Sequence, residues 1–187
     1  MATIAITTVY SVLRYNVFKG VPWSQVPLFV MNKSVAWSSI ILLAIASWEA
    51  FRNRQRLIDS SPWAMGAGLA LVHVVMSLPL LIARTHFPDF FVHSMHLRSG
   101  IHVSMWGGAM AMLCLWLCRR WFGAALLAPV AVVLHVSLIG ARNWLHPADW
   151  PGHMVPVSLW SVLAAAVMAA GVMASLERRF RYGHQNK

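Results

Sequence analysis

The chain has 187 residues, of which 59% are hydrophobic and only 11% are charged. Soluble domains carry about 25% charged residues, so this composition excludes an ordinary soluble domain and predicts an integral membrane protein. The formal charge is +10, but the cations form short clusters at the ends of apolar runs, as membrane topology requires, and we expect no nucleic-acid partner.

Six apolar runs follow one another with short connections between them. They are residues 1–18, 26–51, 62–83, 97–118, 122–144 and 157–176. A bilayer-spanning helix needs about 20 apolar residues. We therefore expect a single all-α membrane domain over residues 1–187, built as a bundle of about six transmembrane helices. The first run contains Arg14, and the bundle has five spans if this run lies in the interface instead.

Local signals mark two helix boundaries. Ser61 followed by Pro62 predicts the start of the third helix, with the serine as N-cap and the proline in the first turn. Residues 177–187 are basic, and we expect them to form a solvated cytoplasmic tail.

The arginine clusters predict the orientation, because cytoplasmic connections carry an excess of Lys and Arg. Tight clusters fall on one set of connections, and scattered cations fall on the other. The clustered set is Arg52, Arg54, Arg56, Arg119, Arg120, Arg178, Arg179, Arg181 and Lys187, and the scattered set is Arg14, Lys19, Lys33, Arg84, Arg98 and Arg142. We expect a multi-pass protein of the bacterial inner membrane with a cytoplasmic C-terminus.

Two histidines lie near the middle of apolar runs, His73 in the third and His135 in the fifth. An ionisable side chain at this depth is costly and indicates a functional site. At 1.5 Å per residue, His73 is roughly 17 Å and His135 roughly 20 Å from the start of its helix. Both helices run from inside to outside, so the two imidazoles are expected to meet at one level.

Paired imidazoles on parallel helices suit the two faces of one haem, with the apolar macrocycle among the helices. The propionates of a haem need cations. Arg142 is roughly 10 Å beyond His135 along the same helix, and Lys33 sits near the same outer end of its own helix. The alternatives are a helix-to-helix hydrogen bond for each histidine and an ordinary interfacial cation for Arg142.

Further histidines gather on the outer side around His102, which is a candidate metal ligand. They are His86, His93, His96, His146 and His153. Together they could bind copper, zinc or a second haem, although loop histidines are usually just solvated. Cys114 and Cys118 share one helix face and show no metal-ligand spacing, so we interpret them as small buried apolar residues.

Four segments carry a resemblance to a known family. They are LRYNVFKGVPW (13–23), PLFVMNK (27–33), LVHVVMSLPLL around His73, and VVLHVSLIGARNWLHPADWPG (132–152). In this order they resemble the ferric reductase-like transmembrane domain, the haem-binding membrane core of ferric reductases, NADPH oxidases and bacterial single-domain relatives.

The resemblance implies that His73 and His135, on the third and fifth helices, are axial ligands of haem b, through which electrons cross the membrane. Many relatives carry two histidines on each of these helices and stack two haems. Here each helix has one, so a second haem would need His102 or an outer-loop histidine. No flavin- or nicotinamide-binding module is present, so the donor is expected to be a separate flavoprotein or membrane quinol, with the acceptor left open.

The sequence thus predicts an oxidoreductase-type electron-transfer component, a b-type membrane cytochrome surrounded by lipid. A non-haem membrane protein is the alternative, either a transporter or assembly subunit or a metal-binding protein that uses the outer histidines. No inverted repeat or matched pair of broken helices, which secondary transporters show, is visible.

Overall fold

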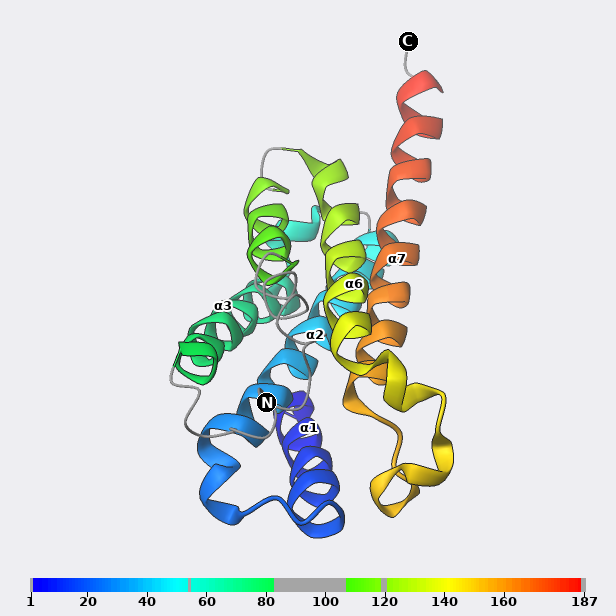
Figure 1. Cartoon of the computed structure of the whole chain (residues 1–187). Coiled ribbons are helices and arrows are strands. Elements are labelled where there is room, and N and C mark those ends of the chain that lie inside the picture. The colour runs from blue at the N-terminus through cyan, green and yellow to red at the C-terminus, as the bar shows by residue number, and fades with distance from the viewer. Residues whose placement is uncertain (1, 54, 83–106, 119–120, 186–187) are drawn as a thin grey trace.

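Helices follow one another along the chain, as the apolar runs predict. In the computed structural model, which describes residues 2–53, 55–82, 107–118 and 121–185, the chain forms helices joined by turns, and no strand occurs in these ranges (Figure 1). The all-α fold class is confirmed for these residues.

The longer helices are α1 Ala2–Val12, α2 Met31–Asn53, α3 Ser61–Ile82, a helix at Gly107–Leu117, α6 Leu127–Trp144 and α7 Val157–Gln185. Shorter π-helical and 3-10 segments extend or connect them. These are η1 Leu13–Phe18, η2 Trp23–Gln25, η3 Val26–Val30, η4 Leu57–Asp59, η5 Phe122–Leu126, η6 Pro147–Asp149 and η7 Pro151–His153.

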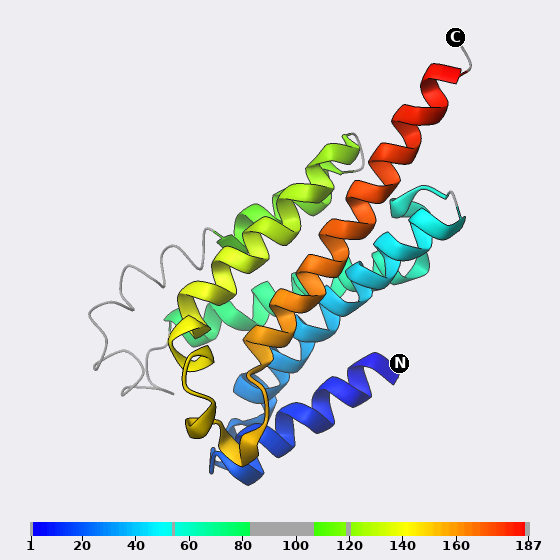
Figure 2. The same cartoon turned by 90° about the vertical axis from the view of Figure 1, so that its right-hand side faces the viewer.

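The described helices run up and down between two ends of the bundle (Figures 1 and 2). The upper end, as drawn, holds the turn between α2 and α3, the turn before α6 and the C-terminal end of α7. The lower end holds residues 19–25 and residues 145–156. Because α3 and α6 both begin at the upper end and run to the lower, they are parallel, as the sequence predicted.

Two helical stretches are long and apolar enough to cross a membrane. They are Trp23–Asn53 and Pro151–Arg178, and shorter apolar helical stretches lie at Ser61–Ser77, Gly107–Leu117 and Gly123–Leu138. The lengths of the described segments therefore support membrane association for two of the expected spans.

Helix α2 lies at the centre and packs against α1, α3 and α7. Its buried surface is rich in serine and alanine, and small residues let helices approach closely and hydrogen-bond inside a membrane. Thr7 of α1 is 3.1 Å from the Ser34 hydroxyl and 2.5 Å from that of Ser38. On the side of α2 that faces α3, the Ser39 hydroxyl donates to the Gly66 carbonyl at 2.7 Å.

Close packing of α2 on α3 depends on Gly66. A Cβ atom at this position would lie 2.9 Å from Leu43 Cγ and 3.1 Å from the Leu43 backbone nitrogen. The backbone atom cannot move aside as a side chain can, so glycine allows this approach. The approach matters because α2 carries Asn32 and α3 carries His73 and Ser77, which are hydrogen-bonded to Asn32.

One helix boundary differs from the sequence-based prediction, and another helix runs beyond the predicted span. The N-cap of α3 is Ser60 and not Ser61, because the Ser60 hydroxyl accepts the Trp63 backbone N–H at 3.3 Å; the adjacent serines have equal capping propensity. Helix α7 continues past residue 176 to Gln185, into the segment expected to be a tail. Arg178 anchors this extension, with its guanidinium over the Phe51 ring at 4.1 Å and an N–H donated to the Phe51 carbonyl.

Candidate functional site

Two imidazoles meet inside the bundle, one from α3 and one from α6. The ring centroids of His73 and His135 are 6.3 Å apart, and the ring planes make an angle of 79°. Both residues are half-buried. The two side chains therefore lie at one level of two parallel helices, which confirms the depth argument made from the sequence.

A closed hydrogen-bond network orients His73. The Asn32 side chain lies between α2 and α3 and is only 7% exposed. Its amide Nδ2 donates to the Ser77 hydroxyl at 3.0 Å, and that hydroxyl donates to the His73 carbonyl at 2.8 Å. The Asn32 Oδ1 then faces His73 Nδ1 at 2.7 Å, so Nδ1 carries the proton that it donates. This arrangement keeps Nε2 deprotonated and able to bind a metal.

His135 is placed partly by a glycine on the helix at Gly107–Leu117. A Cβ atom built on Gly107 would lie 3.3 Å from His135 Cβ and 3.7 Å from the Ala131 carbonyl oxygen. The backbone at Gly107 therefore lies directly against the turn of α6 that carries His135. A larger side chain at this position would press on the histidine.

The two cations proposed from the sequence lie on the helix turns nearest the lower end of the bundle, Lys33 on the first turn of α2 and Arg142 on the last turn of α6. Lys33 is half-buried, and its Nζ lies 4.5 Å from the ring centroid of Phe29 and 5.2 Å from that of Tyr15. Arg142 is exposed on the last turn of α6. Only Lys33 therefore has its charged group among the side chains of the bundle.

The remaining candidate ligands do not join the pair in the part of the chain that the structure describes. His102, His86, His93 and His96 lie outside the described residues. His146 and His153 are exposed on the 145–156 segment. Among the described residues, no group of three or more His, Cys, Asp or Glu side chains could hold a metal ion.

Both cysteines are buried and unbridged. Cys118 donates its thiol to the Leu115 carbonyl within its own helix. These positions agree with the interpretation of Cys114 and Cys118 as small packing residues.

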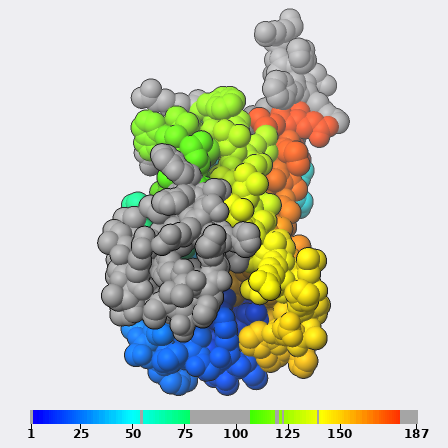
Figure 3. Space-filling view, in the orientation of Figure 1, coloured from blue at the N-terminus to red at the C-terminus, as the bar shows by residue number. Residues whose placement is uncertain are grey.

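At the lower end of the bundle, the N-terminal segment formed by α1 and η1 contacts the segment of residues 145–156. The Tyr10 hydroxyl donates to the Val155 carbonyl at 2.8 Å, and Arg14 Nη1 donates to the Met154 carbonyl. Phe18 lies against Gly152, where a Cβ atom would clash with its ring. In the space-filling view, the N-terminal segment and the 145–156 segment lie side by side here (Figure 3).

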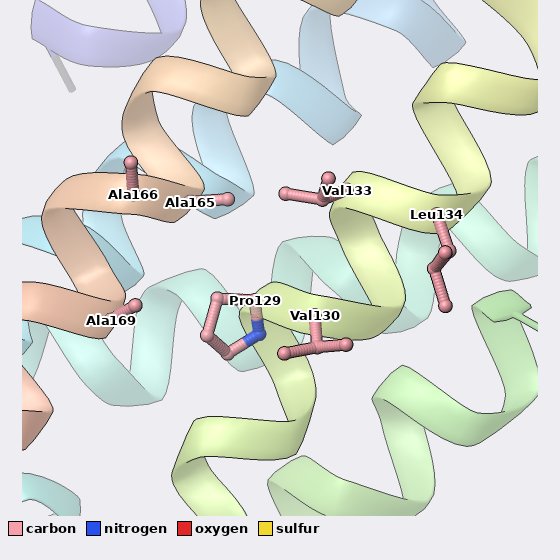
Figure 4. Close-up of a pocket in the computed structure, with 7 residues that line it drawn as sticks. All are labelled: Pro129, Val130, Val133, Leu134, Ala165, Ala166 and Ala169. Atoms are coloured by element: carbon pink, nitrogen blue, oxygen red, sulfur yellow. The ribbon is translucent and has the colours of Figure 1, made fainter.

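An apolar groove of about 220 Å³ lies between α6 and α7 (Figure 4). It is lined by Pro129, Val130, Val133, Leu134, Ala165, Ala166 and Ala169. Ligand sites usually measure about 300–1,000 Å³ and include a few polar groups. The groove is smaller than that and its lining has no polar side chain, so the histidine pair is the stronger candidate site.

Asparagine 32, Ser77 and Gly107 were not assigned a role from the sequence. The available signal was Asn32 itself, because an amide inside an apolar run is costly unless it finds a partner. The sequence did not show which helix supplies that partner.

Comparison of the chain with protein-family models, curated proteins and solved structures found no match.

Replacing Gly107 by valine should destabilise the fold, because its side chain would press on His135. Overpacking of this kind costs about 1–3 kcal/mol. The matched control is Gly108→Val, where a Cβ atom would meet nothing within 4 Å and which carries the same change in helix propensity. Thermal unfolding in detergent should show a lower midpoint for Gly107→Val only, and equal midpoints for the two variants would contradict the contact.

Proposed function

We propose that the chain is a membrane cytochrome in which His73 and His135 are the axial ligands of one haem b, and through which single electrons cross the membrane. The separation of the two imidazoles carries this proposal. With metal–nitrogen bonds of about 2.0 Å, and a ring centroid about 1.2 Å from its nitrogen, two imidazoles on opposite sides of one ion have centroids about 6.4 Å apart. The observed separation of the two ring centroids, 6.3 Å, is close to this value.

Two imidazole ligands among the described residues suit a haem better than a bare metal ion. A metal held by side chains alone normally takes three or four of them. The described residues supply two imidazoles and no group of three ligands. A metal that brings its own four equatorial nitrogens needs only two axial ligands from the protein.

The Asn32 network supports the same role for His73. Metal-binding histidines almost always donate their second ring N–H to a fixed acceptor, which sets the tautomer and the ring orientation. His73 Nδ1 has such an acceptor in Asn32 Oδ1. In the proposal, Lys33 and Arg142 at the lower end of the bundle are the cations for the propionates.

The surface of the described helices supports a membrane location. Large apolar side chains are exposed on α1, α3, α6 and α7, including Val9, Val75, Leu134 and Leu163. Water would penalise such a surface, whereas lipid would not. We infer about six spans in the inner membrane. Arg52, Arg56 and Arg178 lie toward the upper end, which we assign to the cytoplasm together with the C-terminus.

The chain's own residues then hold, orient and insulate the cofactor. When bound, the haem would supply one-electron redox chemistry. The donor in this proposal is a separate flavoprotein or membrane quinol, and the acceptor lies on the side of the lower end. The chain would be an oxidoreductase component that acts with these partners.

Haem content tests the proposal. The full chain, purified in detergent from haem-replete cells, should contain one haem b by pyridine haemochrome assay. His73→Ala and His135→Ala should each lower this content by about 10–100-fold, at least the loss seen when a ligand's hydrogen-bond partner is removed. His146→Ala is the control, because His146 is exposed on the lower connection. A colourless wild-type protein, or unchanged haem in both ligand variants, would refute the proposal.

Two different substitutions of Asn32 should shift the reduction potential of the bound haem in opposite directions. Asn32→Leu removes the acceptor, makes His73 a weaker donor to iron and should raise the potential. Asn32→Asp supplies a stronger acceptor and should lower it. A tenfold change in the one-electron equilibrium corresponds to about 59 mV. Potentiometric titration measures both shifts, with Asn143→Leu on the exposed end of α6 as control, and shifts of one sign in both Asn32 variants would contradict the network.

A further inference from the structure

Two cations lie over one aromatic side chain at the lower end of the bundle, and a third interacts with them electrostatically. The Arg14 guanidinium carbon is 5.9 Å and Lys33 Nζ is 5.2 Å from the centroid of the Tyr15 ring. Lys19 follows at the end of η1 and interacts electrostatically with Tyr15, Arg14 and Lys33. We call Arg14, Lys19 and Lys33 the Tyr15 cation cluster.

Few carboxylates among the described residues could neutralise this cluster. The chain has five acidic residues: Glu49, Asp59, Asp89, Asp149 and Glu177. Among the described residues, Glu49, Asp59 and Glu177 belong to the upper end, and Asp149 is exposed on η6; Asp89 lies outside the described residues. Lys19 is exposed as a whole residue, but partial burial of its ammonium lowers its pKa below the usual range; Tyr15 raises this pKa, and the like charges of Lys33 and Arg14 lower it. The cluster is thus a concentration of positive charge.

Arg14 is buried despite its charge, with 6% of its surface exposed. One guanidinium nitrogen donates to the Met154 carbonyl, but its Nε has no hydrogen-bond partner. A buried cation is costly unless an anion or several hydrogen bonds compensate it. The cluster therefore favours an anionic group close by.

We propose that the Tyr15 cation cluster binds one oxyanion group, a carboxylate or a phosphate. Two sources offer this chemistry. One is a propionate of the haem, because Lys33 directly follows Asn32, the partner of His73. The other is the phosphate of an anionic phospholipid, because Val17, Phe18 and Trp23 beside the cluster are exposed apolar side chains suited to the membrane interface. The propionate source rests on the proposed function, and the phospholipid source does not.

The test uses the full chain with Lys33→Gln, Lys19→Gln and the double variant. Arg14 is left intact because it holds the Met154 carbonyl. Arg56→Gln, exposed at the upper end, is the matched control. Lys33→Arg should restore binding, and thermal midpoints establish that each variant folds.

Two probes distinguish the sources. Protein from haem-starved cells is titrated with haemin and with haemin dimethyl ester, which lacks the propionate charges. In parallel, native mass spectrometry counts phosphatidylglycerol retained from mixed vesicles of phosphatidylglycerol and phosphatidylcholine. Loss of a hydrogen bond to a charged group should weaken the relevant affinity about tenfold or more in the double variant.

Each outcome has a defined meaning. If the double variant no longer prefers haemin over its ester, the oxyanion is a propionate. If that preference is unchanged but phosphatidylglycerol is lost, the oxyanion is a lipid phosphate. If a folded double variant matches the control with both probes, the inference is wrong. A chain that binds neither porphyrin would refute the haem proposal while the lipid probe still decides this inference.

Discussion

The hydrogen bond between His73 Nδ1 and Asn32 Oδ1 joins α3 to α2 at the depth where α6 contributes His135. Other features of the bundle serve this contact. Helix α3 reaches α2 closely because residue 66 is glycine, and the Ser39 hydroxyl fixes the same interface. The amide of Asn32 is satisfied on both sides, by His73 and by Ser77, so burying it is not a net penalty.

In the part of the chain that the structure describes, the buried polar side-chain atoms outside α1 and η1 have a hydrogen-bond partner. Serine and threonine hydroxyls link α1 to α2, and they donate to carbonyls within α2 and α7. The unpartnered buried atoms of Ser11, Arg14 and Asn16 all lie on α1 and η1. The polar groups around His73 therefore have their hydrogen bonds satisfied, whereas the charged lower end has an unsatisfied cation that an anionic ligand could neutralise. A redox cofactor and its propionates would need these two environments in this order.

The sequence was sufficient to predict the helices and the histidine pair, because both depend on local properties. Apolar run length predicts a helix, and equal distance from two helix starts predicts equal depth.

The role of Asn32 could not be predicted, because its partner lies on another helix and the rotation of α2 about its axis is set by packing. The same holds for Gly107, whose importance comes from its contact with His135. The N-cap of α3 was misplaced by one residue because Ser60 and Ser61 are chemically equivalent. The helical structure of α7 beyond residue 176 was not predicted, because it depends on a contact with Phe51 in another helix.

Electron paramagnetic resonance of the oxidised, detergent-purified protein tests the central claim most directly. The two imidazole planes make an angle of 79°. If both rings bind one ferric haem in this orientation, the spectrum should show a strongly anisotropic low-spin signal of the kind produced by near-perpendicular axial imidazoles. A high-spin ferric signal, or the absence of any haem signal, would contradict the account.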